Sequence, residues 1–130
     1  MIQDNPYRGS GAVDDPDGQM VDGRTNADFF ANLKAQSWWG LRMRFQATHR
    51  AIAENKTVDP DTIISLAPNL PELSELISEL AQPTYSIDAA GKILIDKSPP
   101  GTKSPNLADA VCIAFNPASM AARLHIWSKL

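Results

Sequence analysis

Two neighbouring segments decide how this chain folds: GKILIDK at 91–97 and KSPNLADAV at 103–111. The first alternates in the manner of a short β-strand and leads through a basic, Pro-rich loop into the second. The second segment predicts the start of a helix, with Ser104 as the N-cap residue and Pro105 at the first helical position. One carboxylate, Asp109, then stands a turn inside that helix among small and apolar residues.

An acid at this place has two interpretations. Asp109 can lie at a solvated edge of the helix, where the positive end of the helix dipole stabilises its charge slightly. It can also be a metal-binding acid that is aimed back at the basic loop. The sequence pattern alone leaves both open.

The residues before and after these segments complete a small α+β arrangement. TYSI at 84–87 and KILID at 92–96 flank DAAG at 88–91, which predicts a β-hairpin with a four-residue loop. The helix that carries Asp109 is expected to run over 105–115, because Asn-Pro at 116–117 stops it. Residues 118–130 can form a last helix on Met120, Leu124 and Trp127, or a tail that docks on a partner.

A long helix is predicted upstream. Thr25 and Asp28 have the spacing of a capping box, and an apolar stripe then continues to about Glu54. Within it, Gly40 is expected to let a neighbouring group approach closely, and the tryptophans at 38–39 fit a packed core better than a base-stacking platform. The basic residues of this helix predict a solvated face or, alternatively, a contact with the DNA backbone: Lys34, Arg42, Arg44, His49 and Arg50.

The middle of the chain predicts a turn and a second helix. Residues 59–61 form the turn, and the apolar residues 63–66 form a helical turn or a brief strand. A helix starts at 69–72 with a one-sided stripe of Leu73, Leu76, Ile77 and Leu80, and Pro83 ends it.

Composition limits the classes of function. The chain has 130 residues, a net charge of −3 and one cysteine, Cys112, so it is one modest domain whose nucleic-acid contacts must be local basic patches. Cys112 is expected to be buried, and no apolar run reaches membrane-spanning length. Residues 1–24 are predicted as a loop or disordered lead-in, and the acids at 14–17 as a solvated turn rather than a calcium loop.

Three stretches together resemble a known family. KSPNLADA at 103–110 looks like the last acidic motif of the large terminase subunit of tailed bacteriophages, whose nuclease domain has a ribonuclease-H-like fold. FANLKAQSWWGLR at 30–42 and QPTYSIDAAGKI at 82–93 fit the same family in order and spacing. The resemblance covers roughly 26–115, and it implies that residues 25–116 are the C-terminal part of that nuclease domain, followed by a helix or tail at 117–130.

The resemblance implies a function. Members of the family are metal-dependent endonucleases that cut concatemeric viral DNA during genome packaging in the bacterial cytoplasm, with Mg²⁺ or Mn²⁺ held by several carboxylates. Asp109 matches the last of these acids and is therefore the expected catalytic and metal-binding residue. Lys97, Lys103 and Ser104 are the expected contacts to double-stranded DNA. The implied partners are the upstream nuclease and ATPase parts of a terminase, its portal and its small subunit.

The chain also departs from the family. The first two acids of the family lie before the 30–42 helix, where this chain has no matching strand, and no G-x-x-x-x-G-K-[S/T] motif is present. We therefore expect a fragment, α/β in the intact domain and α+β by itself, that is inactive alone. Two alternatives stay open: a non-catalytic interaction module or degenerate prophage remnant, and an unrelated small α+β domain. The nuclease interpretation requires Asp109 to face the hairpin and not to be held in an ordinary ion pair turned away from it.

Overall fold

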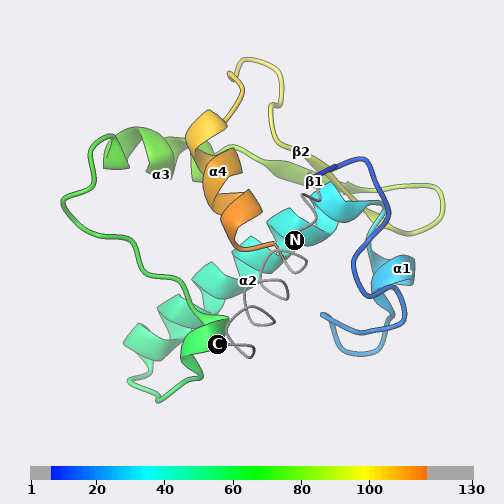
Figure 1. Ribbon diagram of the computed structural model, residues 1–130, viewed down its shortest axis with the longest axis horizontal. Helices are drawn as coiled ribbons and strands as arrows, with labels where there is room; N and C mark the ends of the chain where they lie inside the picture. Colours follow the sequence, from blue (N-terminus) through cyan, green and yellow to red (C-terminus); the bar gives the residue numbers. More distant parts are fainter. Residues whose placement is uncertain (1–6, 117–130) are drawn as a thin grey trace, which may run out of the picture.

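A computed structural model describes residues 7–116 of the chain. Its elements follow one another in this order: α1 (Asn26–Phe29), α2 (Leu33–Ala53), the 3₁₀ turn η1 (Pro60–Thr62), α3 (Leu73–Ala81), β1 (Thr84–Ile87), β2 (Ile93–Asp96) and α4 (Asn106–Ala114). Helix α2 is the longest element, and α4, η1 and β2 all contact it (Figure 1). Helix α3 packs against α4 on the same side of α2. The described part of the chain contains no helix that is long and apolar enough to cross a membrane.

The predicted hairpin is confirmed, and only its second strand starts one residue later than expected. β1 and β2 are antiparallel, with Tyr85 opposite Ile95 and Ile87 opposite Ile93. The turn is held by Asp88, whose Oδ1 accepts hydrogen bonds of 2.9 Å from the backbone N–H groups of Ala90 and Lys92. Gly91 has a φ of 80°, which a side chain disfavours and glycine allows. Local turn chemistry therefore fixes this element.

The prediction of one helix from Thr25 to Glu54 is wrong, because the chain breaks at Phe30. Thr25 does cap α1, since its side-chain oxygen accepts from the N–H of Asp28 at 3.2 Å. Phe30 then adopts an extended conformation and forms a parallel bridge to Ile93, which directs the N–H of Ala31 to the Ile93 carbonyl at 3.0 Å. Asn32 restarts the helix by accepting from the N–H of Ala35. Pairing with a strand far along the sequence thus overrides continuous helix formation.

Two apolar clusters meet along α2. The larger contains Trp38 and Leu41 of α2 together with residues from the rest of the chain: Ile64, Leu76, Ala108 and Cys112. The smaller contains Phe30, Ala35 and Ile93. The core assignment of Trp38 and the burial of Cys112 are confirmed. Gly40 does permit close approach, because a Cβ there would stand 3.0 Å from the Cε methyl of Met20.

The segment 7–23 contains turns but no helix or strand, and hydrogen bonds attach it to α2. The N–H groups of Leu33 and Lys34 donate to the carbonyls of Gly11 and Gly9. The buried Gln36 side chain accepts from the N–H of Asp14 at 2.7 Å and donates to its carbonyl at 3.0 Å. These polar contacts, together with the packing of Val13, Met20 and Val21 against the smaller apolar cluster, place this segment without regular structure.

The two short helices begin later than predicted. Helix α3 starts at Leu73 rather than at 69–72, after Glu72 in a left-handed conformation with φ of 62°. Ser104 is not the N-cap of α4: that position is Pro105, which offers no side-chain hydrogen bond, and the Ser104 hydroxyl donates to Asn106 Oδ1 instead. Residues 63–66 form neither a helix nor a strand, and the Thr48 hydroxyl bonds both the N–H and the carbonyl of Ile64. The predicted last helix or tail at 117–130 lies outside the described residues.

Candidate functional site

The structure brings together two of the predicted site residues, Asp109 and Lys97. Asp109 lies in the first turn of α4, and Lys97 directly follows β2. The Lys97 Nζ donates to Asp109 Oδ2 at 2.7 Å, and the two side chains are 35 % and 24 % exposed, respectively. Asp109 therefore faces the exit of the hairpin, as the metal-site interpretation requires. It is nevertheless held in an ion pair, which that interpretation did not anticipate.

The end of α3 positions this pair. The Gln82 side-chain amide donates to the carbonyls of Lys97 and Lys103, at 2.8 and 2.7 Å. The Glu79 carboxylate accepts from the N–H of Leu107 at 3.1 Å, and so supplies to α4 the N-terminal hydrogen bond that Ser104 was expected to give. Both ends of the basic loop and the start of α4 are thus fixed by two side chains of one neighbouring segment.

The two other predicted residues lie on the loop that these bonds hold. Lys103 and Ser104 are exposed, and neither side chain bonds Asp109. They stand on the solvent side of the loop between β2 and α4, where their predicted contact with DNA stays a prediction.

The charge of Asp109 also acts on two groups outside the loop, the thiol of Cys112 and the phenol of Tyr7. Burial raises the pKa of the Cys112 thiol to about 12; the negative charge of Asp109 adds to this shift, and Lys97 opposes it. Burial also raises the pKa of Tyr7, against a hydrogen bond with Ser37 that lowers it, and the charge of Asp109 contributes to the rise. Asp109 thus stands between a solvated loop and a partly apolar interior. A thiol with this pKa stays protonated at neutral pH.

Sequence reasoning missed Tyr7, Glu79 and Gln82. Glu79 and Gln82 stand at the polar end of an otherwise ordinary amphipathic helix, and Tyr7 stands in a loop. No local pattern marks them, because each acts on residues distant in the sequence. Local sequence patterns do not show that α3 contacts the loop after β2, and this contact is what gives Gln82 its role.

The donor set for a divalent cation is incomplete in this part of the chain. Among residues 7–116, no group of three or more His, Cys, Asp or Glu side chains is placed to hold a metal ion. Mg²⁺ and Ca²⁺ require several oxygen ligands, so Asp109 alone does not make a site. It fits the role of one ligand among others that this part of the chain does not supply.

The fold corresponds to that of a class of viral nuclease. Over 84 % of its length the chain is similar to nuclease domains of a phage large terminase subunit. The structure of the nuclease domain of the large terminase subunit gp2 of bacterial virus Sf6 matches with a TM-score of 0.76 and 32 % sequence identity, and the chain covers 51 % of that domain. The family resemblance read from the three sequence stretches is thereby confirmed.

Mutant forms of the same Sf6 domain match in the same way. One, with manganese and beta-thujaplicinol, gives a TM-score of 0.74 at 30 % identity, and one with calcium gives 0.72 at 30 % identity; the chain covers 84 % of its own length and 51 % of theirs in both cases. The chain therefore spans about half the length of the solved domains that it matches. No protein-family model matches the chain, and no curated protein matches it in sequence.

Proposed function

We propose that this chain is part of the nuclease of a phage terminase large subunit, a metal-dependent endonuclease that cuts concatemeric viral DNA during genome packaging. Residues 25–116 would be the C-terminal part of its ribonuclease-H-like domain, with the hairpin as the strand pair that leads into the last acidic helix. The similarity to the Sf6 nuclease domain supports the family. The observation that carries the site is the direction of Asp109, which faces the exit of the hairpin.

The contact with Lys97 supports Asp109 as an oriented ligand. A carboxylate in the first turn of a helix is stabilised by the helix dipole, and an ammonium group 2.7 Å away compensates its charge further. The contact with Lys97 holds Asp109 in one orientation, toward the strand ends. A fixed orientation is what a cation ligand needs before other acids join it.

The remaining ligands must come from outside the described residues, which is why the fragment alone would be inactive. In the complete site, Mg²⁺ or Mn²⁺ would supply the activation of water and the stabilisation of the leaving oxygen of a phosphodiester. The manganese-containing Sf6 domain supports this choice of metal. The role of this chain would be to present Asp109 at a fixed angle, with Glu79 and Gln82 holding the helix start and the loop.

DNA would approach along the loop between β2 and α4. Lys97 and Lys103 stand at its two ends and Ser104 follows, so two cations and a hydroxyl border the phosphate path. Because the chain carries a net charge of −3, such binding depends on this local patch. The upstream nuclease and ATPase parts of a terminase, its portal and its small subunit would be the protein partners, in the cytoplasm of the bacterial host.

Reconstitution tests the proposal. The chain is co-expressed with the half of the Sf6 nuclease domain that it does not match, and plasmid cleavage is measured with Mn²⁺ and with Mg²⁺. We expect cleavage by the pair and none by the chain alone. Asp109→Asn should lower the rate at least about 100-fold, because it removes a ligand charge. The matched control Asp61→Asn, in the exposed turn η1, should leave the rate unchanged. If the pair cleaves DNA and Asp109→Asn leaves that rate unchanged, Asp109 is not part of the site.

A second candidate is a non-catalytic interaction module, or a remnant of a prophage terminase. The incomplete set of metal ligands in residues 7–116 favours it. The same experiment separates the two functions: a stable complex with the complementary half that never cleaves DNA supports the module, and metal-dependent cleavage supports the nuclease.

A further inference from the structure

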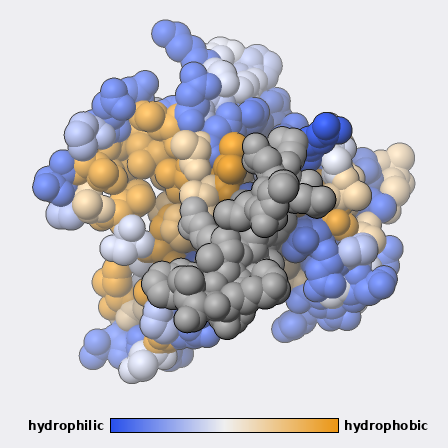
Figure 2. Space-filling view, in the orientation of Figure 1, coloured by the Kyte–Doolittle hydropathy of each residue, from blue (hydrophilic) through white to orange (hydrophobic). Residues whose placement is uncertain are grey.

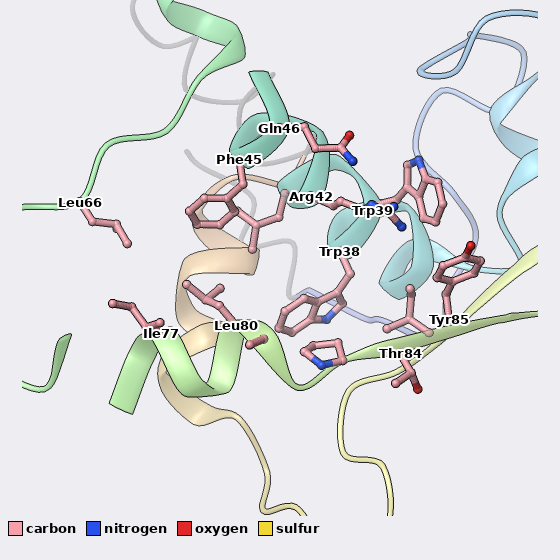
Figure 3. Close-up of a pocket in the computed structure, with 14 residues that line it drawn as sticks. Trp38, Trp39, Arg42, Phe45, Gln46, Leu66, Ile77, Leu80, Thr84 and Tyr85 are labelled. Atoms are coloured by element: carbon pink, nitrogen blue, oxygen red, sulfur yellow. The ribbon is translucent and has the colours of Figure 1, made fainter. Parts of the chain in front are cut away.

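An apolar groove of about 540 Å³ lies beside β1, and neither Asp109 nor Lys97 lines it. Figure 3 shows its walls: Trp38, Trp39 and Phe45 come from α2, and Ile77 and Leu80 from α3. Thr84 and Tyr85 of β1 form its border with the hairpin. In Figure 2, apolar side chains gather in the region between α3 and α2. A volume of this size accommodates several side chains of a bound peptide.

The edge of β1 next to this groove is unpaired within the described chain, where β1 pairs with β2 alone. The Asp88 N–H donates to the Lys92 carbonyl, and bonded pairs alternate along an antiparallel ladder, so the N–H and carbonyl groups of Tyr85 and Ile87 point away from β2. Tyr85 and Ile87 are 53 % and 65 % exposed. An open edge with large exposed side chains is a template for one more strand.

The groove carries a positive charge that no acid of residues 7–116 neutralises in an ion pair. Among the described residues that line the groove, Arg42 is the ionised one, with its guanidinium carbon 4.7 Å from the ring centre of Trp39 and 5.6 Å from that of Tyr85. The ion pairs in this part of the chain join Lys56 to Glu54 and Lys97 to Asp109, and do not include Arg42. Arg50 extends the positive charge along the same helix. An occupant that complements this groove is therefore apolar and acidic.

We propose that β1 and this groove bind an extended, apolar and acidic segment of another polypeptide, which adds a strand to the outer edge of β1. Alternate side chains of the segment fill the groove, and an Asp or Glu pairs with Arg42. The site is separate from the proposed nuclease centre and does not depend on it.

Charge distinguishes this occupant from two other candidates, the chain's own 117–130 segment and a second copy of the chain. The chain's own 117–130 segment contains Arg123 and Lys129 and no Asp or Glu, so it would place like charges beside Arg42. A second copy that pairs through its own β1 brings the sequence TYSI, and the Asp88 that follows already accepts two hydrogen bonds within its own turn. Neither complements the groove.

Binding is tested with synthetic peptides of about eight residues, the length of an ordinary strand. On the face that meets the groove, the probe carries Val with one Glu among them, and it carries Thr at every other position; the control has Lys in place of that Glu. Fluorescence anisotropy measures affinity, and amide hydrogen exchange locates the contact. We expect the Glu peptide to bind with a dissociation constant between about 10 μM and 1 mM and to protect the amides of Tyr85 and Ile87. A Glu peptide methylated on alternate backbone nitrogens should not bind, because it cannot form the ladder.

Charge reversal completes the test. Arg42→Glu should weaken the Glu peptide roughly tenfold and make the Lys peptide the better ligand. Circular dichroism of the variant checks that it is folded, and Arg42→Gln, which removes the charge alone, should bind both peptides equally. The proposal is overturned by equal affinity of the unmodified chain for both peptides, by failure of the Glu peptide to bind at about 1 mM, by protection away from β1, or by a dimer that buries the groove.

Discussion

The ion pair between Lys97 and Asp109 gives the sharpest energetic prediction. Two unit charges 2.7 Å apart attract by about 6 kcal/mol at an effective dielectric constant of 20. Water reaches about a third of the Lys97 side chain and a quarter of Asp109, and both groups lost part of their hydration on folding. The net coupling that remains should be about 1 to 2 kcal/mol.

A double-mutant cycle measures this coupling. Lys97→Met, Asp109→Asn and the double variant are unfolded in urea and followed by tryptophan fluorescence, to which Trp38 of the core contributes. The singles should each lose about 1 to 2 kcal/mol, and the double variant should lose clearly less than their sum. Raising the salt concentration to about 1 M should reduce the coupling only in part, since the pair is half-buried.

The chain contains its own control. Lys56 and Glu54 form a pair of similar length, 2.8 Å, but their side chains are 69 % and 48 % exposed. The same cycle on this pair should give less than about 0.5 kcal/mol. If the two cycles give the same value, or if Asp109→Asn alone stabilises the fold, then the shielding of the Lys97–Asp109 pair by the fold has been misjudged.

Three other predictions concern the interior. Burial raises the pKa of Cys112 from an ordinary 9.0 to about 12, so above pH 9 the unfolded chain releases a proton that the folded chain retains. The free energy of unfolding should therefore fall by about 1.4 kcal/mol between pH 7 and pH 10. Parallel urea titrations of Cys112→Ala should not show this loss. Gln36→Ala should cost about 2 kcal/mol and expose the amide of Asp14 to hydrogen exchange, because both backbone groups of Asp14 lose their partner. Gly40→Val should lower the melting temperature by more than Gly40→Ala, because only the smaller side chain leaves the Met20 methyl room to move.

The sequence predicted the elements whose causes are local. The hairpin follows from Asp88 and Gly91, which form the turn by themselves. The break at Phe30 was missed, because it depends on Ile93, a residue far along the chain, and Asn32 as a new cap was hidden within a long apolar stripe. Patterns of spacing describe one segment at a time and carry no information on such pairings.

The candidate site also contains residues that local sequence patterns predict and residues that they do not. Asp109 and Lys97 stood out as charges next to a predicted helix start and strand end, and the fold does bring them into contact. The hydrogen bond to the start of α4 was assigned to Ser104 from proximity in sequence, whereas the structure uses Glu79 of α3. The anchoring role of Gln82 had no local signal, because one amide spans two carbonyls that neither turn nor helix rules connect.

The double hydrogen bond of Gln82 has a consequence for engineering. One side-chain amide bonds the carbonyls of both Lys97 and Lys103. The intervening segment 98–102 therefore begins and ends at fixed points. Its length and sequence can then change at an entropic cost that grows only slowly with size, without shifting the acid that follows. This is the place in the chain to insert a fluorophore-binding tag or a protease site, with the geometry around Asp109 left intact.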